Sequence, residues 1–226
     1  MLCQEWSLVK RFHPDLKVIP LYCHCWTCPT CRPHRTTRLI SEATRGIPLI
    51  FITLTSRYRS GHSPAAAARD LVDAWRKVRA EYLKLHGRGS LPFLAVFEAT
   101  KKGWPHLHIV ARARWINQRW LSRRMTALIG APIVWVERID SIRKIANYVA
   151  KYIGKNPHRF AGTKRYWRSL DYLNHDHDPT EGADSPAEPW QIVHMPFGAY
   201  IAQAMWLGFD VEFGKGEALL SLRKPP

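Results

Sequence analysis

Two histidines and one glutamate are spaced so that they can meet on one face of a β-hairpin. His106 and His108 lie in the apolar run PHLHIV, where the alternation of side chains along a strand directs both imidazoles to the same side. Glu98 precedes His106 by eight residues, and a hairpin centred on Lys102 would put the two directly opposite each other. Such a set suits Mg²⁺ or Mn²⁺ with phosphate and water completing the shell, although imidazole also suits zinc. The alternative is a surface pair of histidines that binds no metal.

Two tyrosines lie four residues apart in the segment NYVAKYIGKNP, which has the period of an amphipathic helix over residues 141–155. Tyr148 and Tyr152 fall on one flank of the apolar stripe, and Lys151 lies further round the helix. A phenol becomes a nucleophile when its proton is removed or when the phosphate it attacks is polarised. A cation held by the two histidines and the glutamate would polarise that phosphate. The alternative is a pair of border tyrosines that only pack their rings.

The charge of the chain indicates a polyanionic partner. There are 34 Lys and Arg against 18 Asp and Glu in 226 residues, a formal net charge of +16, which favours nucleic acid or an anionic membrane surface. Residues 141–170 contain eight basic and no acidic residues, so this segment is expected to contact DNA phosphates, with tryptophan stacking on bases. The predicted DNA-binding residues are Lys144, Lys155, Arg159, Lys164, Arg165, Trp167 and Arg168.

A membrane is the less favoured partner, because no apolar run approaches the roughly 20 residues that a spanning helix needs. The opening MLCQEWSLVK has charge before any hydrophobic stretch and does not resemble a signal peptide. We therefore expect a protein without membrane partners that works in the cytoplasm.

Four of the five cysteines are crowded into CHCWTCPTC, which favours metal binding over disulfides. Cys28 and Cys31 have the spacing of one half of a zinc knuckle. The other half is less clear: Cys23 is the third expected ligand of a structural Zn²⁺, and the fourth is either Cys25 or Cys3. Free thiols are the alternative.

The hydrophobic pattern predicts seven elements from residue 47 onward. They are a strand at 47–55, a helix that begins after Ser63 and ends before Gly87, strands at 91–99 and 106–113, a helix after Asn117, a strand at 132–139 and the helix at 141–155. The first six follow the order β-α-β-β-α-β, which predicts an α+β fold: a ferredoxin-like or RRM-like antiparallel sheet with helices on one face.

The remaining segments differ in composition from this core. We expect an N-terminal extension with the zinc knuckle at 1–46, a main domain at 47–170, an acidic flexible loop at 171–189 and a C-terminal extension at 190–226. The apolar run FGAYIAQAMWLGF in the last of these is a candidate helix.

Three short motifs, FITLTS, His-hydrophobe-His and YVAKY, resemble in order and spacing the motifs of the HUH endonuclease superfamily. They are most similar to rolling-circle replication initiator (Rep) proteins, and YVAKYIGK resembles the two-tyrosine motif of initiators from small single-stranded DNA bacteriophages. The resemblance covers roughly residues 50–155 and implies the HUH endonuclease fold. It also implies that Tyr148 or Tyr152 attacks a phosphodiester in single-stranded DNA, with Lys151 orienting the phosphate.

The resemblance further implies a replication origin as substrate, a 5′-phosphotyrosyl intermediate, and a host DNA polymerase and helicase as partners in a bacterial host. The chain has no G-x-x-x-x-G-K-[ST] motif of its own, so unwinding is expected from the host. Two competing interpretations remain. One is a non-catalytic single-stranded nucleic-acid binder, since a sheet of this topology also binds RNA. The other is a transposase or relaxase of the same superfamily, although relaxases usually place the tyrosine before the histidines.

Overall fold

The computed structural model describes residues 3–12, 15–87, 89–141, 157–173, 189–214 and 216–222. The chain forms two compact units. One is the central unit, Arg35–His177, and the other is the terminal unit, which combines Met1–His34 with Asp178–Pro226. The helix α1, Cys31–Arg45, begins in the terminal unit and continues into the central one.

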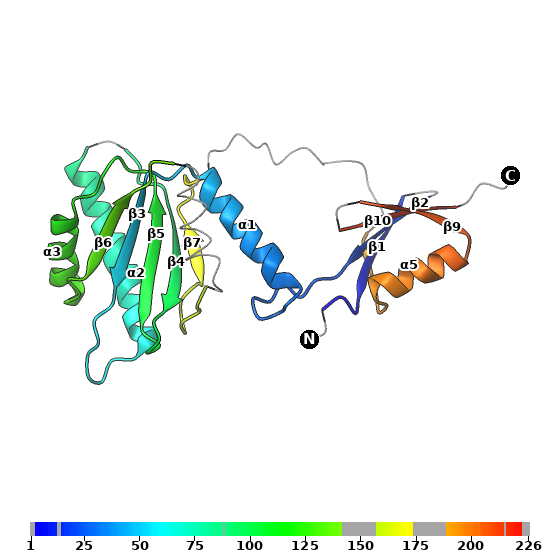
Figure 1. Cartoon of the computed structure of the whole chain (residues 1–226), viewed down its shortest axis with the longest axis horizontal. Helices are drawn as coiled ribbons and strands as arrows, with labels where there is room; N and C mark the ends of the chain where they lie inside the picture. The colour runs from blue at the N-terminus through cyan, green and yellow to red at the C-terminus, as the bar shows by residue number, and fades with distance from the viewer. Residues whose placement is uncertain are drawn as a thin grey trace. The chain divides into compact units, whose positions relative to one another are not determined.

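The central unit contains a five-stranded antiparallel sheet in the order β6-β3-β5-β4-β7, drawn side by side in Figure 1. Its strands are β3 (Ile50–Thr55), β4 (Phe93–Ala99), β5 (Pro105–Ala111), β6 (Val134–Arg138) and β7 (Tyr166–Arg168). Two helices connect them, α2 (Pro64–Leu85) after β3 and α3 (Gln118–Ile129) after β5. The β-α-β-β-α-β order and the sheet order of its four strands are those of a ferredoxin-like sheet, so the predicted α+β class is confirmed.

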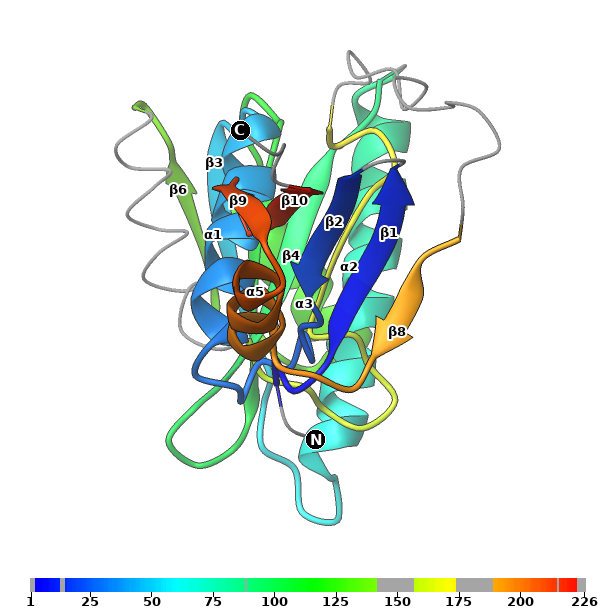
Figure 2. The same ribbon diagram turned by 90° about the vertical axis from the view of Figure 1, so that its right-hand side faces the viewer.

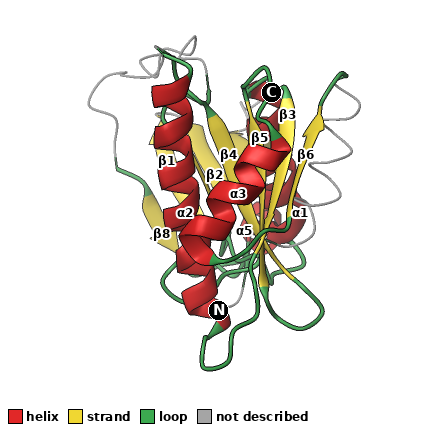
Figure 3. Ribbon diagram, turned by 90° about the vertical axis from the view of Figure 1, so that its left-hand side faces the viewer, coloured by secondary structure: helices red, strands yellow, loops and turns green. Residues whose placement is uncertain are grey.

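Helices α2 and α3 cover the same face of this sheet, as Figure 3 shows. The alternate residues Ile52 of β3 and Ile109 of β5 are fully buried in a core that includes Leu71 and Trp75 of α2 and Met125 of α3. Because side chains alternate along a strand, the intervening residues point to the opposite face. We call this opposite face, which carries Glu98, His106 and His108, the histidine face.

The helix ends follow the expected capping chemistry. Ser63 accepts a hydrogen bond from the backbone N–H of Ala66 at the start of α2, with Pro64 in the first turn. Asn117 caps α3 in the same way, and Gly130 ends that helix at φ +64°, a left-handed conformation that glycine adopts without a Cβ penalty. These caps determine where each helix begins or ends beside the sheet.

A buried tyrosine joins the end of α1 to the sheet of the central unit. The Tyr172 side chain is fully buried, and its hydroxyl donates to the Ala43 carbonyl at 2.6 Å. Arg112, just after β5, donates to the carbonyls of Gly46 at 3.0 Å and of Tyr172 at 2.6 Å. The Tyr172 ring lies so close to Gly46 that a Cβ there would overlap with it.

The substitution Gly46→Ala is therefore expected to destabilise the chain by about 1–3 kcal/mol, the usual cost of overpacking. Gly89→Ala is the matched control, because a Cβ at Gly89 meets nothing within 4 Å. Equilibrium denaturation measures both free energies of unfolding. A Gly46→Ala variant as stable as the Gly89→Ala variant would show that the Tyr172 ring can move aside without cost.

The terminal unit is built from both ends of the chain. Its five strands form an antiparallel sheet in the order β8-β1-β2-β10-β9, of which β8, β1 and β2 stand side by side in Figure 2. They are β1 (Ser7–Phe12), β2 (Asp15–Pro20), β8 (Gln191–Val193), β9 (Phe209–Phe213) and β10 (Ala218–Leu222). The helix α5 (Phe197–Trp206) packs Ile201 and Ala204 against Val18 and Leu220 of the sheet.

The candidate helix in the apolar run after residue 196 is confirmed as α5. The pairing of β2 with β10, which aligns Val18 with Ala218, was not anticipated from the sequence. No helix in the described part of the chain has the length and apolarity needed to cross a bilayer.

Candidate functional site

The β4–β5 hairpin brings Glu98 and the two histidines onto the histidine face. Glu98 is the cross-strand partner of His106, which is the register expected from a turn centred on Lys102. On the other side of β5, Thr53 of β3 is the partner of His108. Three neighbouring strands therefore supply the polar groups of this face, and two rows of backbone hydrogen bonds fix their relative positions.

His108 is the best-fixed of these groups. Its side chain is only 3% exposed, and its ring stacks on Phe51 at a centroid distance of 5.6 Å. Its Nε2 lies 2.7 Å from Oε2 of Glu98, and its Nδ1 lies 3.1 Å from the hydroxyl of Thr53. Both ring nitrogens therefore have partners, as a buried imidazole requires.

These contacts define where the proton of a neutral His108 sits. A carboxylate only accepts hydrogen bonds, so Nε2 carries the proton towards Glu98 and Nδ1 accepts from the Thr53 hydroxyl. For Nε2 to act as a metal ligand, the proton must move to Nδ1, where the same hydroxyl can accept a hydrogen bond. Thr53 fits both tautomers because a hydroxyl is both donor and acceptor. The sequence contained this residue within FITLTS, but its polar role follows only from the register.

His106 is more accessible than its neighbour and lies nearer the end of the sheet. Its ring centroid is 6.2 Å from that of His108, with the two rings nearly perpendicular. Partial burial lowers the pKa of His106 below its ordinary value, and the adjacent His108 lowers it further, while Glu98 opposes both effects. The neutral imidazole, which is the form that binds metals, is therefore favoured.

The three groups have the donor types that a divalent ion needs, but their ligand atoms are not gathered into a closed cluster. Within the described ranges, only the set of Cys3, Cys23, Cys28 and Cys31 brings all its candidate ligand atoms within 4.8 Å of one another. On the histidine face, the hydrogen bond between His108 and Glu98 occupies two of the three candidate ligands. That bond must open before both can coordinate one ion.

The expected nucleophiles fall outside the described residues. Tyr148, Lys151 and Tyr152, with Lys144 and Lys155, all lie in the segment 142–156. The geometry of the histidine face can therefore be stated, and the position of the tyrosines relative to it stays a prediction.

The other predicted DNA-binding residues lie on or before β7. Arg165 donates to the Pro157 carbonyl at 2.6 Å, and Nε of Arg168 lies 3.8 Å from the Glu42 carboxylate, so both also hold the fold together. Arg159 and Lys164 are exposed. The ring of Trp167 packs at the edge of the core, 5.5 Å from Phe97 between centroids. The tryptophan that was expected only to stack on bases thus also has a structural contact.

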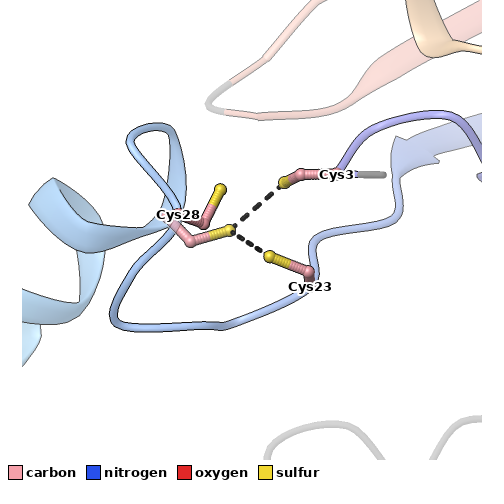
Figure 4. Close-up of side chains that lie close together, drawn as sticks. Cys3, Cys23 and Cys28 are labelled. Carbon is pink, nitrogen blue, oxygen red and sulfur yellow. Dashed lines mark hydrogen bonds between the residues drawn. The ribbon is translucent and has the colours of Figure 1, made fainter. Parts of the chain in front are cut away.

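The cysteine cluster lies in the terminal unit. Figure 4 shows the side chains of Cys3, Cys23 and Cys28 converging from the N-terminal segment and from the loop before α1. Cys31, the first residue of α1, lies with its sulfur 3.3 Å from that of Cys3 and 3.7 Å from that of Cys23. Four sulfurs this close can hold one metal ion, and a four-thiolate set is typical of tetrahedral zinc.

The thiol pKa values show why such a cluster favours a cation. The backbone N–H of Cys31 and the neighbouring thiol groups lower the pKa of Cys28 to about 6. A backbone hydrogen bond with Cys23 lowers the pKa of Cys3, but burial and the surrounding thiols outweigh it and raise that pKa to about 12. One thiolate forms readily and the others resist ionisation beside it. A divalent cation would replace their protons and remove this repulsion.

Cys25 lies apart from the four and supports the loop through its backbone. Its thiol donates to the Cys23 carbonyl at 3.4 Å and its carbonyl accepts from the N–H of Cys28 at 3.2 Å. Its own N–H points to the Cys23 sulfur at 3.5 Å. Of the two alternatives for the fourth ligand, Cys3 is therefore the one whose sulfur lies with the other three.

We expect purified protein to carry about one zinc ion per chain, the stoichiometry of a four-thiolate site. Cys28→Ser should lose most of that metal, because one of four ligands is removed, whereas Cys25→Ser should retain it. Elemental analysis after gel filtration measures the zinc-to-protein ratio. Equal zinc loss in both variants would show that Cys25 also belongs to the ligand set.

Comparison with known families identifies one relationship. Residues 49–157 match the model of a family described as replication-associated protein ORF2. The matched segment contains β3 to β6 with Glu98, His106 and His108, and it continues over Tyr148 and Tyr152. Neither the curated proteins nor the solved structures gave a match. The family match supports a role in the initiation of replication.

Proposed function

We propose that this chain is a rolling-circle replication initiator that nicks and rejoins single-stranded DNA at an origin. The observation that carries the proposal is the register of the β4–β5 hairpin, which pairs Glu98 with His106 within a segment that matches a replication-associated family. A ferredoxin-like sheet with this polar set on its open face is what an HUH-type endonuclease requires. A plain nucleic-acid binder has no need for the set.

In this proposal Glu98, His106 and His108 would hold one Mg²⁺ or Mn²⁺ ion. When bound, such an ion polarises the scissile phosphate and stabilises the charge that builds on the leaving oxygen. The residues fit, because imidazole nitrogens and a carboxylate come from adjacent strands and the Thr53 hydroxyl can accept a hydrogen bond from Nδ1 of His108 once Nε2 has lost its proton. The low pKa of His106 keeps its ligand form available near neutral pH.

The proposed reaction is a transesterification at phosphorus. The phenolic oxygen of Tyr148 or Tyr152 forms a bond to the phosphorus, and the bond from phosphorus to the 3′ oxygen breaks. The phenolic proton leaves to solvent or a base, and the departing 3′ oxygen takes up a proton to become a free hydroxyl. The DNA 5′ phosphate stays on the tyrosine, which conserves the energy of the bond for rejoining.

The free 3′ hydroxyl would prime a host DNA polymerase, and a host helicase would unwind the template. Two tyrosines on successive turns of one helix can reach the same phosphate site in turn, so that the second can cut a regenerated origin while the first still holds a strand. Lys151 between them would orient the phosphate.

The proposal is tested by incubating the full chain with a library of labelled single-stranded oligonucleotides in Mn²⁺. A covalent adduct that survives denaturation is expected, together with a released fragment that ends in a 3′ hydroxyl. The adduct should disappear in EDTA. Binding without an adduct, unchanged by EDTA, would favour the non-catalytic single-stranded nucleic-acid binder instead.

A further inference from the structure

A pocket of about 460 Å³ lies on the helix-covered side of the central unit, away from the histidine face. Its walls come from α2 and from the segment before and within β7. The lining residues are Arg69, Val72, Asp73, Arg76, Gly162, Thr163, Lys164, Trp167 and Arg168. Trp167 is the register partner of Ala95, whose side chain belongs to the core beneath α2, which places the pocket on that side.

The floor of this pocket is apolar and aromatic. The rings of Trp167 and Phe97 lie 5.5 Å apart at 44°, and Val72 packs on the same core. Trp167 is only partly buried, so it is held in place from one side and remains accessible to the pocket from the other. A fixed aromatic surface of this kind can stack a nucleobase at little entropic cost.

The rim of the pocket is positively charged. Arg69, Arg76 and Lys164 are exposed, and Asp73 is the acidic residue among the lining side chains. The ion pair of Arg76 with Asp73, at 3.2 Å, is solvated on both sides and therefore weak, so it does not prevent Arg76 from turning to a phosphate. Guanidinium groups bind phosphate oxygens in a bidentate geometry.

The turn that carries Lys164 is anchored to α2. Arg69 donates to the Ala161 carbonyl at 3.4 Å, and the hydroxyl and N–H of Thr163 both donate to the Phe160 carbonyl. Gly162 makes the turn possible at φ +76°, with Arg69 3.5 Å from where a Cβ would lie. Cations from two segments that are distant in sequence are thus held around one aromatic floor.

We propose that this pocket binds one nucleotide of the single-stranded DNA substrate, with the base on Trp167 and the flanking phosphates between Arg69, Arg76 and Lys164. The inference rests on the proposed function and adds a second contact for the strand, remote from the histidine face. A planar apolar base and its anionic phosphates match the floor and the rim together, which neither a simple anion nor an apolar ligand does.

Binding can be separated from cleavage by measuring fluorescence anisotropy of a labelled oligonucleotide in EDTA. Arg69→Gln and Arg76→Gln should each weaken binding several-fold and reduce the slope of log affinity against log salt by about 0.7, the value for one lost phosphate contact on single strands. Lys77→Gln is the matched control, because it removes one charge from the same helix but does not line the pocket. Its affinity should fall less than that of the arginine variants.

The stacking contact is tested by photocrosslinking. An oligonucleotide carrying 5-iodouracil, irradiated in complex with the full chain, should crosslink to the peptide that contains Trp167, as mass spectrometry can show. Trp167→Phe keeps an aromatic ring and should preserve most of the affinity, whereas Trp167→Leu should lose roughly 5- to 100-fold. Circular dichroism of each variant confirms that it is folded.

The outcomes distinguish this inference from the proposed function. If the wild type forms the covalent adduct but the Arg69 and Arg76 variants bind like Lys77→Gln, the pocket inference is wrong and the proposed function stands. If no oligonucleotide binds and no adduct forms, both fall together. If free deoxynucleotide monophosphates at micromolar concentration block the crosslink, the pocket is a site for free nucleotides and the assignment to the DNA strand is overturned.

Discussion

Tyr148→Phe combined with Tyr152→Phe is expected to abolish the covalent adduct, because no phenolic oxygen then remains at either expected nucleophile. Each single variant should still form an adduct if both tyrosines reach the phosphate, but it should fail when a second cut is needed on the same strand. Denaturing gels with labelled DNA measure both results. The loss in the double variant should be complete within detection, since a nucleophile is removed rather than weakened.

Two further variants make this experiment specific. Tyr82→Phe on α2 is the matched control: it also removes a phenolic hydroxyl, but it belongs to the helix-covered side of the sheet. Tyr166→Phe tests the nearest alternative, because Tyr166 on β7 is the register partner of Val96 and so faces the same side as Glu98. An adduct that persists in the double variant and vanishes with Tyr166→Phe would move the nucleophile to the sheet edge.

His108→Ala and Glu98→Gln should each reduce the rate of adduct formation by more than about 100-fold, because a bound metal ion stabilises the transition state by several kcal/mol. Glu137→Gln is the matched control, since Glu137 pairs with Phe51 and lies on the same face of the sheet. Single-turnover rates at saturating Mn²⁺ measure the effect. Rates unchanged in His108→Ala would remove the histidine face from the mechanism.

Thr53→Val provides a graded test of the same site. It keeps the shape of the side chain but removes the hydroxyl that lies 3.1 Å from Nδ1 of His108. Loss of such a supporting contact should raise the Mn²⁺ concentration for half-maximal rate by roughly 10- to 100-fold. The maximal rate should recover at high Mn²⁺, which distinguishes a positioning residue from a metal ligand.

Much of the central unit could be predicted because its signals are local. Ser63, Asn117 and Gly130 mark helix ends by their own chemistry, and alternation in PHLHIV assigns both histidines to one face. The hairpin register followed from the short distance between Glu98 and His106, because a tight turn leaves few alternatives. The contact of Thr53 with His108 could not be predicted, since it depends on a pairing between residues 55 positions apart.

The terminal unit shows the opposite case. Strand β2 pairs with β10 across most of the length of the chain, and no local pattern encodes that register. The choice between Cys3 and Cys25 had the same difficulty, because it depends on where β1 and β2 carry the N-terminal segment rather than on cysteine spacing. Arg69 and Arg76 were not considered as DNA contacts, because on a helix they look like an ordinary solvated face.

The pairing of β2 with β10 also sets the order of events during synthesis. At 5–20 residues per second the ribosome needs roughly 10–40 seconds to make the intervening chain, whereas all strands of the central unit are complete well before β10. Until then β2 has an unpaired edge, which is a site for association between nascent chains. We therefore expect premature termination before residue 209 to yield insoluble fragments even though the central unit they contain is whole.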